Sequence, residues 1–224
     1  MKKLFYTCCI SLALVNCKVD NYSGPNAVIT GKIVDSETGD LVPSGGSVAG
    51  TIVRFYQNNS AQPLTYTTFP DGTFTNEAVF TGNYTYTAEG AFKPVSTAPQ
   101  SVTVTPQTQV EIPVVPNVRL TLTAVSASGD KAVYKVGYQK LAGDQTFTEL
   151  GISWANYKNP NRIVYKGGFT ILEDVSVLNY TTGEKEYELT GLAPGTTYYI
   201  RAYARTNNPG AFFNYSQQLE LKVP

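Results

Sequence analysis

A succession of short extended runs, separated by turn residues and starting at Ala27, constrains the fold of this chain more than any other feature. In the run "TIVRFYQ" the side chains alternate, with Ile52, Arg54 and Tyr56 on one face and Val53 and Phe55 on the other. The run "GNYTYTAEG" alternates in the same way, and the Asp-Gly pair of "FPDGTF" suits a tight turn. These patterns predict strands joined by short turns.

Helices between these strands are not expected, because no long stretch has apolar residues at a 3.6-residue period. Tyrosine, threonine and valine, which favour strands, are abundant among the 224 residues. Without helical crossovers the sheets should be antiparallel, and each must cover its apolar face with a second sheet. The sequence therefore predicts an all-β protein of two tandem antiparallel β-sandwiches, in residues 27–116 and 118–224.

The predicted boundary between the sandwiches is very short. The segment "QVEIPVVPNVRLTLTAV" ends one strand and begins the next, with only Pro116 and Asn117 between them. Pro113 and Pro116 lack the N–H group that a strand ladder uses, so a continuous ladder is not expected there. A flexible linker would be longer and richer in glycine and serine. We therefore expect the two sandwiches to hold a nearly fixed angle.

Both predicted sandwiches resemble known folds. The order of "GKIVDSETGDLV", "TIVRFY" and "DGTFTNEAVFTGNYTYTA" in residues 27–116 resembles the carboxypeptidase-regulatory-like and transthyretin-like sandwiches of exported proteins. In residues 118–224, "TELGISWANYKNPN" and "YELTGLAPGTTYYIRAYA" resemble parts of a fibronectin type III domain. That resemblance places Tyr198 at a corner between two strands, with its ring buried and its hydroxyl bonded to nearby backbone. It implies the fold alone, because such sandwiches serve many functions.

The first residues have the pattern of an export signal, with two lysines before the short apolar run "LFYTCCISLALV". Residues 1–16 are predicted to be a lipoprotein signal peptide, because "LVNC" resembles a bacterial lipobox that makes Cys17 the lipidated first residue. Residues 17–26 would then form the lipidated cysteine and a polar stalk. The alternative is a free cysteine in a leader. Lys18 and Asp20 resemble part of a Bacteroidota surface-export signal, so we expect an outer-membrane lipoprotein that faces the cell exterior, anchored by lipid alone.

The charge of the chain is balanced, with 17 lysines and arginines against 17 aspartates and glutamates, so nothing indicates a nucleic-acid partner. The chain has no histidine, which excludes a Ser-His-Asp triad and the usual zinc sites.

Two alternatives stay open: a hydrolase with paired carboxylates, and calcium binding by "DSETGD". We expect the acidic clusters to be solvated, and we predict no catalysis, no metal site and no cofactor. The clusters are Asp35, Glu37 and Asp40; Glu173 and Asp174; and Glu184, Glu186 and Glu188.

The whole layout, a lipobox followed by regulatory-like and fibronectin-like sandwiches, is similar to a Bacteroidota family of uncharacterised two-domain lipoproteins from glycan-utilisation loci. That resemblance implies a non-catalytic protein, accessory to glycan binding and uptake. Its partners would be a glycan, proteins of an outer-membrane transporter complex, or both. No motif transfers residue by residue from that family. The alternative function is a structural or adhesive spacer, or a protein-docking module, at the cell surface.

A tyrosine-rich strand supplies the candidate binding residues. The chain has 16 tyrosines, whose rings can stack on sugars while their hydroxyls bind sugar hydroxyls. If Tyr198 is buried, strand alternation directs Tyr199, Arg201 and Tyr203 outward. We therefore predict a ligand or partner face built from these three residues, with Tyr157 at its rim. Packing of the first sandwich against the same face is an equally weighted alternative.

The neighbouring strand of a fibronectin-like sheet would carry "ELGISWA". If Ile152 and Trp154 point inward, the outward residues are Gly151, Ser153 and Ala155. These small side chains would leave a shallow shelf beside the outward tyrosines. Trp154 is predicted to be a core residue and not a sugar platform, because large aromatic residues dominate sandwich cores.

Overall fold

The computed structural model describes residues 23–46, 50–58, 60–163, 169–173 and 181–223. Within these residues sixteen strands form four sheets, which confirms the predicted all-β class. The first eight strands are β1 (Ala27–Asp35), β2 (Ile52–Gln57), β3 (Leu64–Thr67), β4 (Thr73–Val79), β5 (Gly82–Glu89), β6 (Phe92–Pro94), β7 (Gln100–Val104) and β8 (Gln107–Pro116). The other eight are β9 (Val118–Ser128), β10 (Lys131–Lys140), β11 (Phe147–Ala155), β12 (Phe169–Glu173), β13 (Thr182–Leu189), β14 (Thr197–Thr206), β15 (Phe213–Tyr215) and β16 (Leu219–Lys222).

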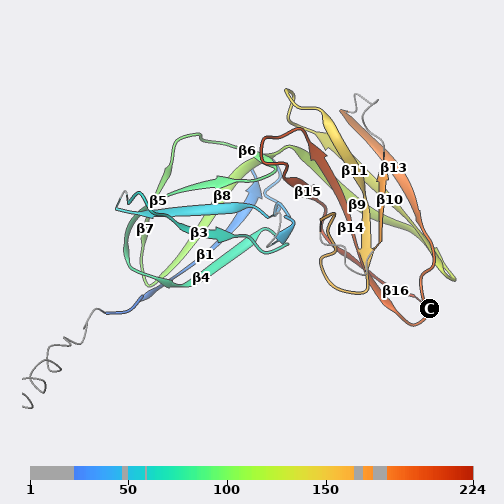
Figure 1. Cartoon of the computed structure of the whole chain (residues 1–224), viewed down its shortest axis with the longest axis horizontal. Helices are drawn as coiled ribbons and strands as arrows, with labels where there is room; N and C mark the ends of the chain where they lie inside the picture. Colours follow the sequence, from blue (N-terminus) through green and yellow to red (C-terminus); the bar gives the residue numbers. More distant parts are fainter. Residues whose placement is uncertain (1–22, 47–49, 59, 164–168, 174–180, 224) are drawn as a thin grey trace, which may run out of the picture.

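Strands β1–β8 form the N-terminal sandwich (Figure 1). One sheet has the order β4-β1-β8-β6 and the other β3-β2-β5-β7. Val53 and Phe55 are fully buried between the sheets, whereas Arg54 and Tyr56 on the opposite face of β2 are partly exposed. The alternation read from this run is therefore confirmed. The core also takes in Ile29 and other inward residues of both sheets.

One strand pair departs from the predicted antiparallel arrangement. β1 and β8 run parallel, from Val28 opposite Gln107 to Asp35 opposite Val114. A parallel pair needs a long connection. Here the intervening chain provides it, because β2, β3, β5 and β7 build the second sheet before β8 returns, and no α-helix occurs in the described residues between β1 and β8. The expected break between strands is found at Asn117, between β8 and β9, although β8 itself continues through Pro113 to Pro116.

Strands β9–β16 form the C-terminal sandwich. Its sheets have the orders β13-β10-β9 and β12-β11-β14-β15, with β16 also paired to β14. Trp154 is 6% exposed in the core between them, as predicted. Tyr198 is also buried, and its hydroxyl accepts a 3.2 Å hydrogen bond from the backbone N–H of Ala193. The predicted tyrosine corner is therefore confirmed.

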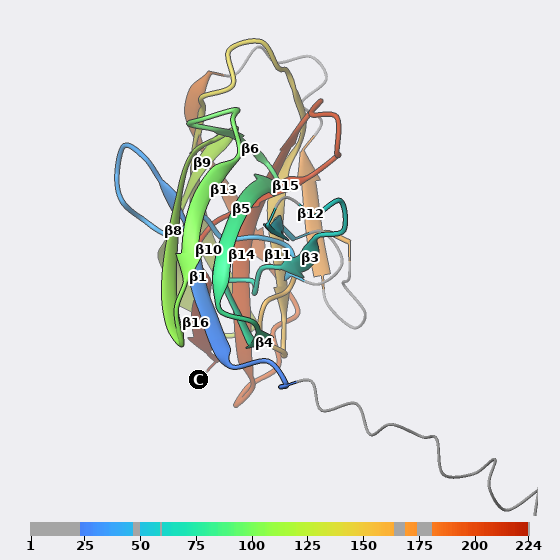
Figure 2. The same ribbon diagram turned by 90° about the vertical axis from the view of Figure 1, so that its left-hand side faces the viewer.

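The two sandwiches lie side by side and meet near β6 and β15 (Figure 1), and Figure 2 shows the N-terminal one in front of the other. Asn117 is the single residue between β8 and β9, and it is buried. Its N–H donates to the carbonyl of Ala91 at 2.9 Å, while its own carbonyl accepts from Leu141 at 2.9 Å and from Ala142 at 3.2 Å. Residues of both sandwiches thus hold the junction.

The predictions for residues 1–22 lie outside the described residues. They comprise the signal peptide, Cys17 and most of the stalk.

Candidate functional site

The structure brings together the two strands on which a binding face was predicted. β11 and β14 are antiparallel neighbours, as expected. The facing pairs are Gly151 with Tyr203, Ser153 with Arg201, and Ala155 with Tyr199. Small side chains therefore do lie beside the tyrosines and the arginine.

Arg201 nevertheless lies in no open face. Its side chain is 1% exposed. One guanidinium nitrogen, Nη2, donates to the carbonyls of Ser44 (3.1 Å) and Pro70 (3.2 Å) in the N-terminal sandwich, and Nε donates to Ser216 of its own sandwich (3.3 Å). The prediction that Arg201 contacts a ligand is therefore wrong. The alternative, that the first sandwich packs against this face, is the arrangement that the structure has.

Tyr203 is also buried, with 0% exposure, in a small cluster with Phe213 and Tyr215. It is therefore not part of an open shelf. The guanidinium of Arg201 lies 4.4 Å from the centre of the Tyr215 ring. Because burial disfavours charged forms, it lowers the pKa of Arg201 to about 10 and raises the pKa of Tyr215 to about 12. At neutral pH a cation therefore lies over a neutral ring.

Tyr199 and Tyr157, the other two predicted site residues, are half-buried. Burial raises the pKa of Tyr157. The segment that follows β11 returns across the sheet, where the N–H of Arg162 donates to the hydroxyl of Tyr215 at 3.2 Å. Asn161 of this segment reaches the N-terminal sandwich, donating to the carbonyl of Gly45 at 3.4 Å. The outward face of β11 and β14 is thus largely covered by other parts of the chain.

Two further contacts join the sandwiches. Arg119 lies 2.7 Å from a carboxylate oxygen of Asp35 and 2.9 Å from one of Glu37. Asn214 is buried; its side-chain oxygen accepts from Val118 at 3.0 Å, and its amide donates to the carbonyl of Ala91 at 2.9 Å. Two acids of "DSETGD" therefore pair with an arginine.

The other acidic residues give no clear chemical site. Glu184 and Glu188 form ion pairs with Lys135 and Lys131 on the exposed face of β10 and β13. The side chains of Glu173 and Asp174 lie outside the described part of the chain. Among the described residues, no three acidic or cysteine side chains gather as metal ligands. No helix in that part has the length and apolar character of a membrane span.

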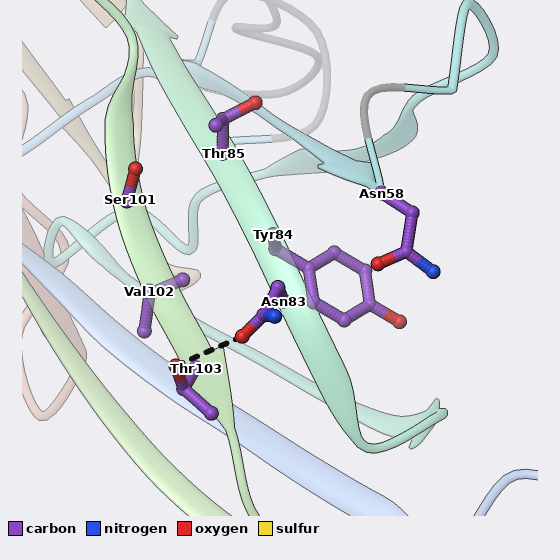
Figure 3. A pocket seen from close by; sticks show the side chains of 7 residues that line it. All are labelled: Asn58, Asn83, Tyr84, Thr85, Ser101, Val102 and Thr103. Carbon is purple, nitrogen blue, oxygen red and sulfur yellow. Dashed lines mark hydrogen bonds between the residues drawn. The ribbon is translucent and has the colours of Figure 1, made fainter.

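An open polar hollow of about 520 Å³ lies on the outer face of β5 and β7 (Figure 3). Its polar lining residues are Asn83 and Thr85 of β5, Ser101 and Thr103 of β7, and Asn58 directly after β2. Tyr84 and Val102, which belong to or pack against the core, complete the lining. Strand register places Tyr56 beside these polar residues, facing Thr85 on the outward side of the sheet. We call Tyr56 and the five polar lining residues the polar array.

The polar array consists of two rows across β2, β5 and β7, and Asn58, which directly follows β2, begins the second row. One row is Tyr56, Thr85 and Ser101, and the other is Asn58, Asn83 and Thr103. Neighbouring strands lie about 4.8 Å apart, so each row spans about 10 Å. In the second row, the hydroxyl of Thr103 donates to the side-chain oxygen of Asn83 at 3.1 Å (Figure 3).

The chemistry of the polar array is uncharged. Its amides and hydroxyls can both donate and accept hydrogen bonds, and Tyr56 adds a partly exposed ring. Arg54, in the next row along the same face, is paired with Glu89 at 2.9 Å. Strand alternation predicts the correct face for Tyr56 but not the array, because strands distant in sequence contribute its two rows.

No family model and no curated protein matches the sequence. Solved structures do share the fold, each over 89% of this chain and 100% of its own. A DUF3823 family protein from Bacteroides uniformis ATCC 8492 has a TM-score of 0.71 at 20% identity, and one from Parabacteroides merdae ATCC 43184 has 0.72 at 16%. A protein from Bacteroides uniformis ATCC 8492, described as a candidate carbohydrate binding protein, has 0.69 at 17%. The chain therefore has the two-sandwich fold of DUF3823 family proteins from Bacteroidales.

Proposed function

We propose that this protein is a non-catalytic, lipid-anchored cell-surface protein that binds a neutral glycan through the polar array, as an accessory to glycan uptake across the outer membrane. The observation that carries the proposal is the composition of the array, six hydroxyl and amide residues with no charge. A glycan presents many hydroxyls that both donate and accept, and these match such side chains. An open sheet face also suits a long chain better than an enclosed pocket does.

The fold neighbours support the glycan part of the proposal. The Bacteroides uniformis protein described as a candidate carbohydrate binding protein has the same two-sandwich fold. At 17% identity this likeness concerns the fold, and function depends on the site. The array is therefore what has to be tested.

A rigid spacer or protein-docking module is the second candidate function. The buried contacts of Arg201 and Asn214 favour it, because they fix one sandwich against the other. A spacer needs a fixed shape and no glycan affinity, so direct binding measurements separate the two functions.

Substitutions in the polar array test glycan binding. We expect the chain from Lys18 to Pro224, titrated with neutral hexasaccharides of glucose, mannose, xylose and galactose, to bind at least one of them. Asn83→Ala should weaken binding roughly 2-fold to 10-fold, as expected for one hydrogen bond. Combined with Tyr56→Ala, it should weaken binding at the array at least about 10-fold, because the stacking ring is also lost.

Thr65→Ala is the matched control, since Thr65 lies on β3 at the opposite edge of the same sheet and is also exposed. It should leave affinity unchanged. Binding that survives the double substitution with its full affinity and number of sites would refute the array. Binding to none of the hexasaccharides would favour the spacer.

The lipid anchor is tested separately through Cys17. We expect the mature protein to be heavier than residues 17–224 by a diacylglyceryl group and an acyl chain, and to partition into detergent. Cys17→Ala should abolish both properties, although Cys8 and Cys9 remain in the precursor. Intact mass spectrometry and detergent-phase partitioning measure them. A native protein with the mass of its amino acids alone, found in the aqueous phase, would contradict the anchor.

A further inference from the structure

A second hollow, of about 470 Å³, lies on the other outer face of the N-terminal sandwich. Two rows of outward side chains from β4, β1 and β8 line it: Thr75, Thr30 and Gln109 in one, and Thr73, Lys32 and Glu111 in the other. Phe69, just before β4, lies at its edge with 50% of its surface exposed. We call this the Phe69 hollow.

The backbone of Phe69 is held firmly in a turn. Its N–H donates to the carbonyl of Thr73 at 2.7 Å, and its carbonyl accepts from Gly72 at 2.9 Å and from the hydroxyl of Ser44 at 3.1 Å. The next carbonyl, that of Pro70, accepts from Ser44 at 3.0 Å and from Arg201 at 3.2 Å. An exposed ring on a backbone fixed from both sandwiches is pre-organised, so little backbone ordering opposes binding there.

The surroundings of the ring favour a sugar over a protein partner. A protein interface needs a contiguous apolar core. Apart from Phe69, the large apolar residues that line the hollow, Phe74 and Val110, are only 2% and 6% exposed, whereas all six row residues are polar. Lys32 and Glu111 form a 2.7 Å ion pair in which both side chains are about half exposed. The charges balance, and both groups can still form charge-assisted hydrogen bonds with neighbouring hydroxyls. An apolar ring face beside hydrogen-bonding groups is complementary to a neutral pyranose.

We propose that the Phe69 hollow is a second glycan-contact site, in which Phe69 stacks on a sugar ring and the row of Thr73, Lys32 and Glu111 binds its hydroxyls. The choice of a neutral glycan as the ligand rests on the proposed function. The site itself is argued from the Phe69 hollow alone. The two sheets pack face to face through the core, so the Phe69 hollow and the polar array point in opposite directions. One short segment of glycan cannot reach both sites of the same protein molecule. A single long glycan would therefore link two protein molecules.

The number of binding sites tests this proposal. Calorimetric titration of the Lys18–Pro224 chain with the neutral hexasaccharides should give two sites per molecule. Phe69→Ala should weaken binding at the Phe69 hollow at least about 10-fold and leave the polar array unchanged. The Tyr56→Ala and Asn83→Ala double variant should weaken binding at the polar array and leave the Phe69 hollow unchanged. The matching long polysaccharide should form turbid cross-linked complexes with the unsubstituted chain but with neither of these two variants.

Phe80→Ala is the matched control, because Phe80 is 44% exposed in the same sandwich but does not line the hollow. This variant should retain two binding sites and still form turbid complexes with the long polysaccharide. If the unsubstituted chain has a single site and Phe69→Ala leaves it intact, the Phe69 hollow is not a glycan site and the polar array is supported. If the single site is lost only in Phe69→Ala, the polar array is overturned and the Phe69 hollow is supported. Binding to no hexasaccharide would overturn both.

Discussion

Arg201→Ala is expected to separate the unfolding of the protein into two transitions. In the native structure this buried side chain donates hydrogen bonds to two carbonyls of the N-terminal sandwich and one of the C-terminal sandwich. Truncation removes these charge-assisted bonds and leaves a cavity beside Tyr215. Each such bond contributes about 1.5–3 kcal/mol and the cavity adds to the loss, but the substitution also removes the cost of burying the guanidinium, which offsets part of it. The free energy of unfolding should fall by about 3–5 kcal/mol, with the contact between the sandwiches lost first.

The single tryptophan makes this separation measurable. Trp154 is buried in the core of the C-terminal sandwich, so its fluorescence reports the unfolding of that sandwich alone. Far-ultraviolet circular dichroism reports the strands of both sandwiches. In urea the two signals should change together in the unsubstituted protein and at different urea concentrations in Arg201→Ala, because coincident signals indicate one cooperative unit.

Arg205→Ala provides the control for this experiment. Arg205 lies on the same strand, and its guanidinium lies 5.0 Å from the centre of the Phe213 ring, but its ion pair with Glu149 stays within the C-terminal sandwich. Glu149 is buried but keeps its ion pair with Arg162, so this variant should lose only about 1 kcal/mol and keep coincident transitions. An Arg201→Ala protein that also unfolds in one transition, with a similarly small loss, would show that Arg201 does not couple the sandwiches.

Local patterns predicted the interior of each sandwich well. Alternation placed Phe55 and Trp154 in the two cores, and the corner motif placed the hydroxyl of Tyr198 on nearby backbone. These predictions succeed because the period of a strand and the chemistry of a turn depend on residues close together in the sequence.

Local patterns did not predict which segments, distant in the sequence, pair or pack against each other. Alternation directs Arg201 out of its own sandwich, but it cannot tell whether solvent or another sandwich lies there. The parallel pairing of β1 with β8 also had no local signal, because these strands begin and end the N-terminal sandwich. The polar array depends on the order of β2, β5 and β7, which the sequence leaves open.

The turn "FPDG" shows what a local pattern predicts and what it does not predict. Its Asp-Gly pair identified a turn, and Gly72 does have a positive φ of 89°. The exposure of Phe69 and the contact of Pro70 with Arg201 depend on packing against β1 and against the other sandwich, which no turn motif encodes.

Gly72→Ala is expected to destabilise the N-terminal sandwich by about 3–5 kcal/mol. A left-handed backbone conformation costs a residue with a Cβ about 1–2 kcal/mol. At Gly72 the new Cβ would also lie 2.4 Å from the carbonyl oxygen of Val42 and 3.0 Å from its carbon. These are backbone atoms, so a side-chain rotation cannot relieve the clash. The carbonyl of Gly72 also accepts from Ile33 at 3.0 Å, and a shift of the turn would strain that bond.

Gly39→Ala separates the effect of the clash from the effect of the backbone angle. Gly39 has a φ of 77°, in the same sandwich, but a Cβ there would meet no atom within 4 Å. Urea unfolding followed by circular dichroism should therefore show a loss of about 1–2 kcal/mol for Gly39→Ala and at least about 2 kcal/mol more for Gly72→Ala. Equal losses would mean that the turn moves away from Val42 without strain. In that event the turn would also be too mobile to present Phe69 as a fixed platform, so this comparison tests the rigidity on which the second glycan site depends.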